Sequence, residues 1–84
     1  MRYSLEVKRS AEREMDRLPP EVHRRISETI LTLEDNPRPF GSQKLRGEEN
    51  YRLRVGDYRV LYMIDDKARR VFVYGVAHRR EAYR

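Results

Sequence analysis

The sequence predicts a small α+β domain in which two N-terminal helices pack on one face of a mainly antiparallel sheet. Three observations lead to this fold class: residues 2–8 alternate between polar and apolar, residues 10–35 place apolar side chains at helical spacing, and residues 51–76 alternate again. The expected order of elements is β-α-α-β-β-β. Because the helices and the sheet each have an apolar face to bury, we expect residues 1–84 to form a single domain.

The N-terminal elements are predicted to be one strand and two helices. Residues 2–8 alternate as a strand with one buried side does. Ser10 is the expected N-cap of a short helix that ends before Pro19, and Pro20 suits the first turn of a second helix. The second helix is expected to end at Asn36-Pro37. Its apolar stripe consists of Val22, Ile26, Ile30 and Leu33.

The rest of the chain is predicted to hold a loop, a hairpin and a last strand. Residues 38–50 are rich in glycine, proline and serine, which is typical of a loop. After the hairpin, whose second strand runs to about Ile64, residues 65–69 form a turn and residues 71–76 a strand. We expect residues 78–84 to be a short basic tail.

The hairpin at residues 51–62 is the most informative segment. Gly56-Asp57 is a two-residue turn signal, which sets Arg54 opposite Arg59 and leaves Arg52 on the same face. Like charges directly opposite each other are destabilising, so this pair indicates an anion held between the two guanidiniums. We expect the arginine face to be uncovered and the other face to lie against the helices. That apolar face carries Tyr51, Leu53, Val55, Tyr58, Val60 and Tyr62.

The net charge of +5 comes entirely from the C-terminal part of the chain. Residues 1–49 carry ten basic and ten acidic side chains, whereas residues 50–84 carry nine and four. Sixteen of the nineteen basic residues are arginines, whose planar guanidinium binds phosphate through two hydrogen bonds. This pattern favours nucleic acid as the partner, with an ordinary solvated surface as the alternative.

Features that the sequence lacks exclude several other classes. Without cysteine, disulfides and thiolate metal sites are excluded. No apolar run approaches the roughly 18 residues of a membrane span, and the N-terminus has no signal-peptide block, so we expect a cytoplasmic protein with no membrane partner. Because metal-binding motifs, glycine-rich phosphate loops and carboxylate clusters are missing, we expect no metal and no cofactor.

Three groups of side chains are candidates for chemistry. Arg52, Arg54 and Arg59 can cradle a phosphate, although a solvated strand face is the alternative. Lys44 and Arg46 can add phosphate contacts at the edge, or simply belong to an anchored loop. The tail offers a proton carrier, further guanidiniums and an aromatic ring, or is a frayed chain end. Its candidates are His78, Arg79, Arg80, Tyr83 and Arg84.

Arginines without a metal or paired carboxylates fit the cleavage of RNA. RNA supplies its own nucleophile, the 2′-hydroxyl, so an enzyme needs only to align it, stabilise charge on the phosphate and move protons. Arginine cannot act as the base, because its pKa exceeds about 12. The proton carrier is then His78, Tyr83 or Glu81.

Four segments resemble the RelE/ParE toxin superfamily, and most closely its RelE branch. They are Lys44-Leu-Arg-Gly47, Tyr51-Arg-Leu-Arg54, Gly56-Asp-Tyr-Arg-Val-Leu-Tyr62 and Val76-Ala-His-Arg-Arg-Glu-Ala-Tyr83. The resemblance implies a ribosome-dependent mRNA interferase, an endoribonuclease that cleaves mRNA in the ribosomal A site by 2′-hydroxyl attack. It also implies a cognate RelB-like antitoxin that blocks the site, with operator DNA bound only through the antitoxin complex.

The resemblance also assigns site residues. Arg52 and Arg54 match two basic positions of the first hairpin strand, Arg59 an arginine after the turn, Arg79 a basic residue ending the last strand, and Tyr83 a tyrosine that stacks on the substrate base. The best-known RelE toxins carry lysines at the first two positions, one of them assigned as the general base. Arginine fills that role poorly.

Two other functions compete with RNA cleavage. ParE-like toxins share the fold and poison DNA gyrase without cutting RNA. A basic binding module without catalytic activity is a further alternative. The conjunction of the hairpin arginines with Arg79 and Tyr83 favours RNA, because a gyrase binder has no need of such a groove.

Overall fold

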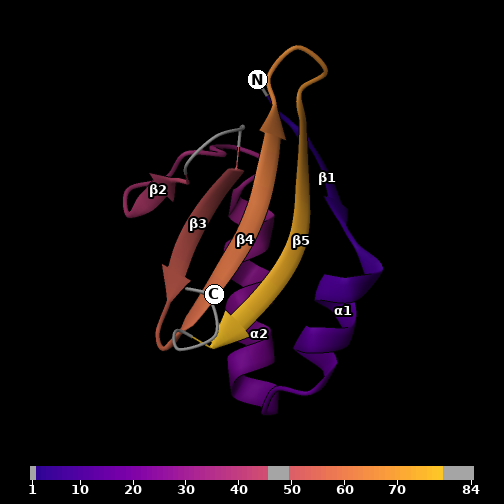
Figure 1. The fold of residues 1–84 in the computed structure, drawn as a ribbon, viewed down its shortest axis with the longest axis vertical. Coiled ribbons are helices and arrows are strands. Elements are labelled where there is room, and N and C mark those ends of the chain that lie inside the picture. The colour runs from indigo at the N-terminus through magenta and orange to yellow at the C-terminus, as the bar shows by residue number, and fades with distance from the viewer. Residues whose placement is uncertain (1, 46–49, 79–84) are drawn as a thin grey trace.

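The computed structural model describes residues 2–45 and 50–78 and contains two helices on one mixed sheet (Figure 1). The strands lie in the order β1-β5-β4-β3-β2, with β1 parallel to β5 and the other neighbours antiparallel. The α+β fold with two N-terminal helices on one face is therefore confirmed. The elements are β1 (Ser4–Val7), α1 (Arg9–Asp16), α2 (Pro20–Thr32), β2 (Ser42–Lys44), β3 (Asn50–Val55), β4 (Tyr58–Asp65) and β5 (Arg70–His78).

The core lies between the helices and the sheet. Figure 1 shows α2 behind the central strands. Its buried Ile26 and Ile30, together with Leu33 at its C-cap, pack in one cluster with the sheet. The strands contribute buried side chains that include Val60 and Tyr62. Each buried large apolar side chain contributes roughly 1.5–3 kcal/mol, so this cluster is what holds the helices on the sheet. Within the described residues, no helix is long and apolar enough to cross a membrane.

The start of α1 differs from the sequence prediction. The helix begins at Arg9 with Lys8 as N-cap, so the assignment of Ser10 as N-cap is wrong. The Lys8 backbone N–H donates to the Val73 carbonyl at 2.8 Å, so pairing with β5 continues up to the helix. The Ser10 hydroxyl is thereby brought beside the same strand, where it donates to the Tyr74 carbonyl at 2.9 Å.

A β-bulge interrupts the pairing of β4 with β5. Leu61 faces Gly75, but the next residue, Tyr62, faces Val73, which leaves Tyr74 without an opposite residue. A bulge of this kind adds one residue to a strand and changes which face the following side chains occupy. The sequence pattern alone gave no sign of this extra residue.

Helix α1 holds the bulged part of β5. Besides the Ser10 bond, the Glu14 carboxylate accepts a hydrogen bond from the Val76 backbone N–H at 2.8 Å. Because of the extra residue, the buried positions of β5 change from Val73 before the bulge to Val76 after it. The alternation then places His78 on the side of the sheet that the helices cover.

The prediction that residues 38–50 form a loop is wrong for residues 42–44, which form strand β2. Residues 42–44 pair antiparallel with β3, with Ser42 opposite Leu53 and Gln43 opposite Arg52. All three residues of β2 are polar, so their sequence shows no alternation of apolar and polar side chains. The strand forms because of its contacts with β3, which the local sequence does not show.

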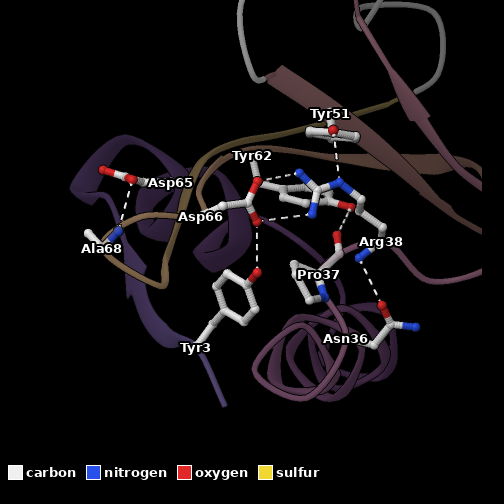
Figure 2. A network of polar contacts seen from close by, with 9 residues as sticks. All are labelled: Tyr3, Asn36, Pro37, Arg38, Tyr51, Tyr62, Asp65, Asp66 and Ala68. Atoms are coloured by element: carbon white, nitrogen blue, oxygen red, sulfur yellow. Dashed lines mark hydrogen bonds and ion pairs between the residues drawn. The ribbon is translucent and has the colours of Figure 1, made fainter. Parts of the chain in front are cut away.

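A polar network closes the end of the molecule opposite the hairpin turn (Figure 2). The Arg38 guanidinium makes two hydrogen bonds to the Asp66 carboxylate, at 2.8 and 3.2 Å, and a third to the Tyr51 hydroxyl at 2.9 Å. The Tyr3 hydroxyl also donates to Asp66, at 2.7 Å. The segment after α2 is thereby tied to the turn between β4 and β5 and to Tyr3, the residue before β1.

Acid should weaken this network through one carboxylate. The hydrogen bond from Arg38, and after it the bond from Tyr3, lowers the pKa of Asp66 from 3.8 to about 2. A lowered pKa means that the contribution of Asp66 to stability is complete above pH 3.8 and is lost as the pH falls toward 2. We expect the free energy of unfolding, measured by urea denaturation, to fall less steeply in this window for Asp66→Asn than for the wild type.

The matched control for that experiment is Asp57→Asn, which changes an aspartate of the hairpin turn at the other end of the sheet. It should keep the wild-type slope. Equal slopes for Asp66→Asn and the wild type between pH 4 and pH 2 would show that the network does not depend on the ionised carboxylate.

Candidate functional site

The hairpin register predicted from the sequence is confirmed. Val55 faces Tyr58 and Arg54 faces Arg59 across the β3–β4 ladder. Gly56 adopts φ +59°, a left-handed conformation that the two-residue turn requires and that glycine accommodates without strain. Because side chains alternate, the apolar residues of the hairpin lie toward the helices, and the arginines share the opposite face.

Arg52, Arg54 and Arg59 together line one hollow on that face. Its volume is about 360 Å³, and Gly41 and Gln43 complete the lining. The three arginines that the sequence singled out are thus brought together, and β2 adds one side of the hollow. An electropositive concave site of this kind attracts phosphate, which guanidinium groups bind in a bidentate manner.

Gln43 is the site residue that the sequence analysis missed. Its Oε1 accepts hydrogen bonds from Nε and Nη2 of Arg52, at 3.0 and 2.5 Å. These bonds hold the Arg52 guanidinium at the edge of the sheet. The sequence gives no sign of this role, because Gln43 comes to lie opposite Arg52 through the pairing of β2 with β3, and strand β2 was not predicted.

The arginines differ in their exposure. Arg54 is exposed, and its Nε lies 3.3 Å from the Gly56 carbonyl, whereas Arg59 is only 7% exposed. The expectation that the whole arginine face is uncovered is therefore wrong for Arg59. It lies on the central strand β4, between β3 and β5, where neighbours on both sides limit its contact with water. A guanidinium in such a place is fixed in position, and an anion near it interacts more strongly than in bulk water.

His78 lies apart from the hollow. It is the last residue of β5, not part of a tail, and faces Tyr58 across the β4–β5 ladder. The two rings meet edge to face with centroids 5.4 Å apart. They belong to a second hollow of about 220 Å³ on the helix side of the sheet, and its lining is Glu14, Arg17, Leu18, Tyr58, Val76 and His78. The bulge in β5 is the physical reason for this placement.

The other predicted site residues contribute less to the described surface. Lys44 is exposed at the end of β2 opposite Tyr51, one position past Gln43, so alternation places it on the other face from the hollow. The remaining candidates lie outside the described residues. They are Arg46, Arg79, Arg80, Glu81, Tyr83 and Arg84.

The fold and the hollow define a small α+β protein that has helices on one face of its sheet and a basic, open site on the other. A family model described as the ParE toxin of the type II toxin-antitoxin system parDE matches residues 3–83. The chain belongs to this RelE/ParE superfamily of type II toxins, as its sequence motifs predicted.

Individual relatives carry RelE-type names. The chain is 33% identical to toxin RelE of Mycobacterium tuberculosis over 84 residues, covering 98% of this chain and 87% of the relative. It is 33% identical to toxin RelG of the same organism over 87 residues, covering 100% and 99%. Both relatives match over nearly the whole chain.

Solved structures show the same fold. The archaeal RelE–RelB complex from Pyrococcus horikoshii matches with a TM-score of 0.85 and 30% identity, over 96% of this chain and 99% of that chain. The isolated RelE toxin of E. coli matches with a TM-score of 0.77 and 28% identity, over 96% and 90%.

The opposition of Arg54 and Arg59 should be measurable as a repulsive coupling in the free protein. We expect a double-mutant cycle of Arg54→Met and Arg59→Met, followed by urea denaturation, to give a double variant less stable than the sum of the single effects. The difference should be about 0.2–1 kcal/mol at low salt and smaller at 1 M salt, because the repulsion can be removed only once and is screened by ions. Strictly additive effects at low salt would contradict the repulsion.

Proposed function

We propose that the protein is a ribosome-dependent endoribonuclease of the cytoplasm, which cleaves mRNA in the ribosomal A site and so stops translation. The observation that supports this proposal is the hollow lined by Arg52, Arg54 and Arg59 on the face of the sheet that the helices leave open. The relatives named toxin RelE and toxin RelG, which match over 98% and 100% of this chain, favour the same class of activity.

The chemistry uses the nucleophile that RNA carries. The 2′-oxygen attacks the adjacent phosphorus, the bond to the 5′-oxygen of the next nucleotide breaks, and extra negative charge develops on the phosphate oxygens in between. Guanidiniums fixed beside those oxygens stabilise that charge without having to reorganise. In this proposal Arg59, on the central strand, and Arg54, opposite it, bind the two sides of one phosphate, which their cross-strand pairing supports.

The reaction also needs one proton removed from the 2′-hydroxyl and one delivered to the 5′-oxygen. Arginine cannot exchange protons near neutral pH. His78 lies with Tyr58 on the helix side of the sheet, so in this proposal Tyr83 serves both transfers and His78 supports the end of β5. The Tyr83 hydroxyl gives its own proton to the 5′-oxygen and receives the proton of the 2′-hydroxyl. Arg79 contributes to the charge on the phosphate, and Lys44, Arg46, Arg80 and Arg84 contribute to RNA binding.

Loss of one hollow arginine should reduce cleavage sharply. Arg54→Ala removes an exposed donor to the phosphate, and the loss of one such donor typically costs about 100-fold in rate or more. The measurement is primer extension on an mRNA translated in a purified system, where cuts within A-site codons report activity. Arg13→Ala, an exposed arginine of α1 on the other side of the sheet, should cleave like the wild type.

An intact message after translation with the wild-type protein would contradict the nuclease proposal. Gyrase inhibition is the second candidate, because the matching family model carries the ParE name. Plasmid DNA that becomes relaxed or linear, with the message intact, would support that candidate, and an effect on neither would support a simple binding module.

We further propose a RelB-like antitoxin as the partner, which covers the arginine face. Solved relatives from Pyrococcus horikoshii and E. coli are described as complexes of RelE with RelB. A cationic hollow calls for acidic or apolar side chains on the partner, since like charges brought together cost several kcal/mol. In this proposal, operator DNA is bound only through the complex.

Charge reversal in the hollow should weaken that complex. Replacing Arg52 and Arg54 by Glu is expected to reduce antitoxin affinity and to flatten its dependence on salt, because the attraction that salt screens would be removed. Titration calorimetry at low and high salt gives both quantities. An affinity that neither salt nor the double substitution changes would mean that the antitoxin seals the protein elsewhere.

A further inference from the structure

One large apolar side chain of the described residues stands fully in solvent. Phe40 is entirely exposed, whereas Leu31 is 57% and Met63 36% exposed. A single exposed apolar residue is ordinary on a protein surface, and it becomes informative only through its setting. In this chain the setting is a hydrogen-bonded turn whose Gly41 lines the arginine hollow.

The turn holds Phe40 at its outer corner. The Ser42 backbone N–H donates to the Pro39 carbonyl at 3.0 Å, so residues 39–42 form a hydrogen-bonded β-turn. Gly41 has φ +95°, as the third residue of a type II turn requires. Phe40 is the second residue of this turn, between Pro39, whose ring fixes its own φ, and Gly41, which adopts the positive φ without steric cost.

The chain is anchored on both sides of this turn. Before it, the buried Tyr62 hydroxyl donates to the Pro37 carbonyl at 2.7 Å, and the Arg38 guanidinium is held by Asp66, as Figure 2 shows. After it, Ser42 pairs with Leu53 at the start of β2. The ring is therefore presented by a fixed backbone, which lowers the entropic cost of using it in binding.

The turn also forms part of the arginine hollow. Gly41, the residue after Phe40, lines the hollow together with Arg52, Arg54 and Arg59. Consecutive Cα atoms lie about 3.8 Å apart across a trans peptide, so the backbone of Phe40 lies directly beside a residue that lines this basic site. An aromatic face next to guanidiniums is the combination with which proteins bind single-stranded RNA, where bases stack and phosphates pair with arginine.

We propose that Phe40 is a base-stacking residue, whose ring receives a nucleobase of the single-stranded RNA that places a phosphate in the arginine hollow. This inference rests on the proposed function, because it names a subsite for the same substrate. It assigns a role to a residue in the segment that the sequence analysis treated only as a loop.

The chain contains no tryptophan, so Phe40→Trp introduces a single fluorescent reporter at the proposed subsite. We expect its emission to be quenched saturably by a short single-stranded oligoribonucleotide at low salt. An abasic oligomer of the same length should bind the arginines but leave the emission nearly unchanged. Leu31→Trp, an exposed position on α2, is the matched control and should not be quenched.

Affinity gives the second readout. Phe40→Ala should weaken oligoribonucleotide binding about five-fold or more, the range expected for the loss of one stacked base, whereas Phe40→Tyr should keep it. Wild-type affinity in Phe40→Ala, no quenching in Phe40→Trp, or no RNA binding by the wild type would each overturn the inference. So would weaker antitoxin binding by Phe40→Ala with unchanged RNA affinity, because the ring would then serve a protein contact.

These readouts separate the stacking subsite from the proposed function. The binding assays use the full-length protein and RNA without ribosomes, so they report on Phe40 whether or not mRNA is cut during translation. A wild-type protein that cuts A-site codons while Phe40→Trp remains unquenched refutes only the subsite. An intact translated message with normal quenching refutes only the nuclease.

Discussion

The register of the β3–β4 hairpin is the constraint on which the rest of the structure depends. A shift of one residue would turn the side chains of one strand to the opposite face relative to its partner. With the two-residue turn at Gly56-Asp57, apolar side chains lie toward the helices, and Arg54 and Arg59 meet on the other side. The core and the basic hollow are thus opposite faces of one sheet, and the same turn sets both. This register also places two positive charges opposite each other, and a bound phosphate would offset their repulsion.

Residues on other elements adjust that face. Strand β2 adds Gln43 beside Arg52, and the turn that leads into β2 carries Phe40 next to Gly41, which lines the hollow. The bulge in β5, which is held by two hydrogen bonds between β5 and α1, moves His78 to the helix side next to Tyr58. The site therefore depends on the whole sheet, because β2 and the bulge in β5 both lie outside the hairpin.

The parts that the sequence predicted are those with a local cause. The hairpin register follows from turn chemistry, and the stripe of α2 follows from helical spacing, so both could be derived residue by residue. Strand β2, the bulge at Tyr74 and the role of Ser10 depend on contacts between segments far apart in the chain, which no local pattern encodes. The burial of Arg59 was missed for the same reason, because it depends on the neighbours of β4 on both sides.

The most direct test of the central claim is whether the hollow binds a phosphodiester. A 2′-deoxy dinucleotide cannot be cleaved by 2′-hydroxyl attack, so titration calorimetry with it measures binding alone. The account predicts saturable, salt-sensitive binding to the wild type and to Arg13→Ala, and its loss in the double variant Arg54→Met, Arg59→Met. Equal affinity of that double variant and the wild type would contradict the assignment of the opposed arginines as the phosphate site.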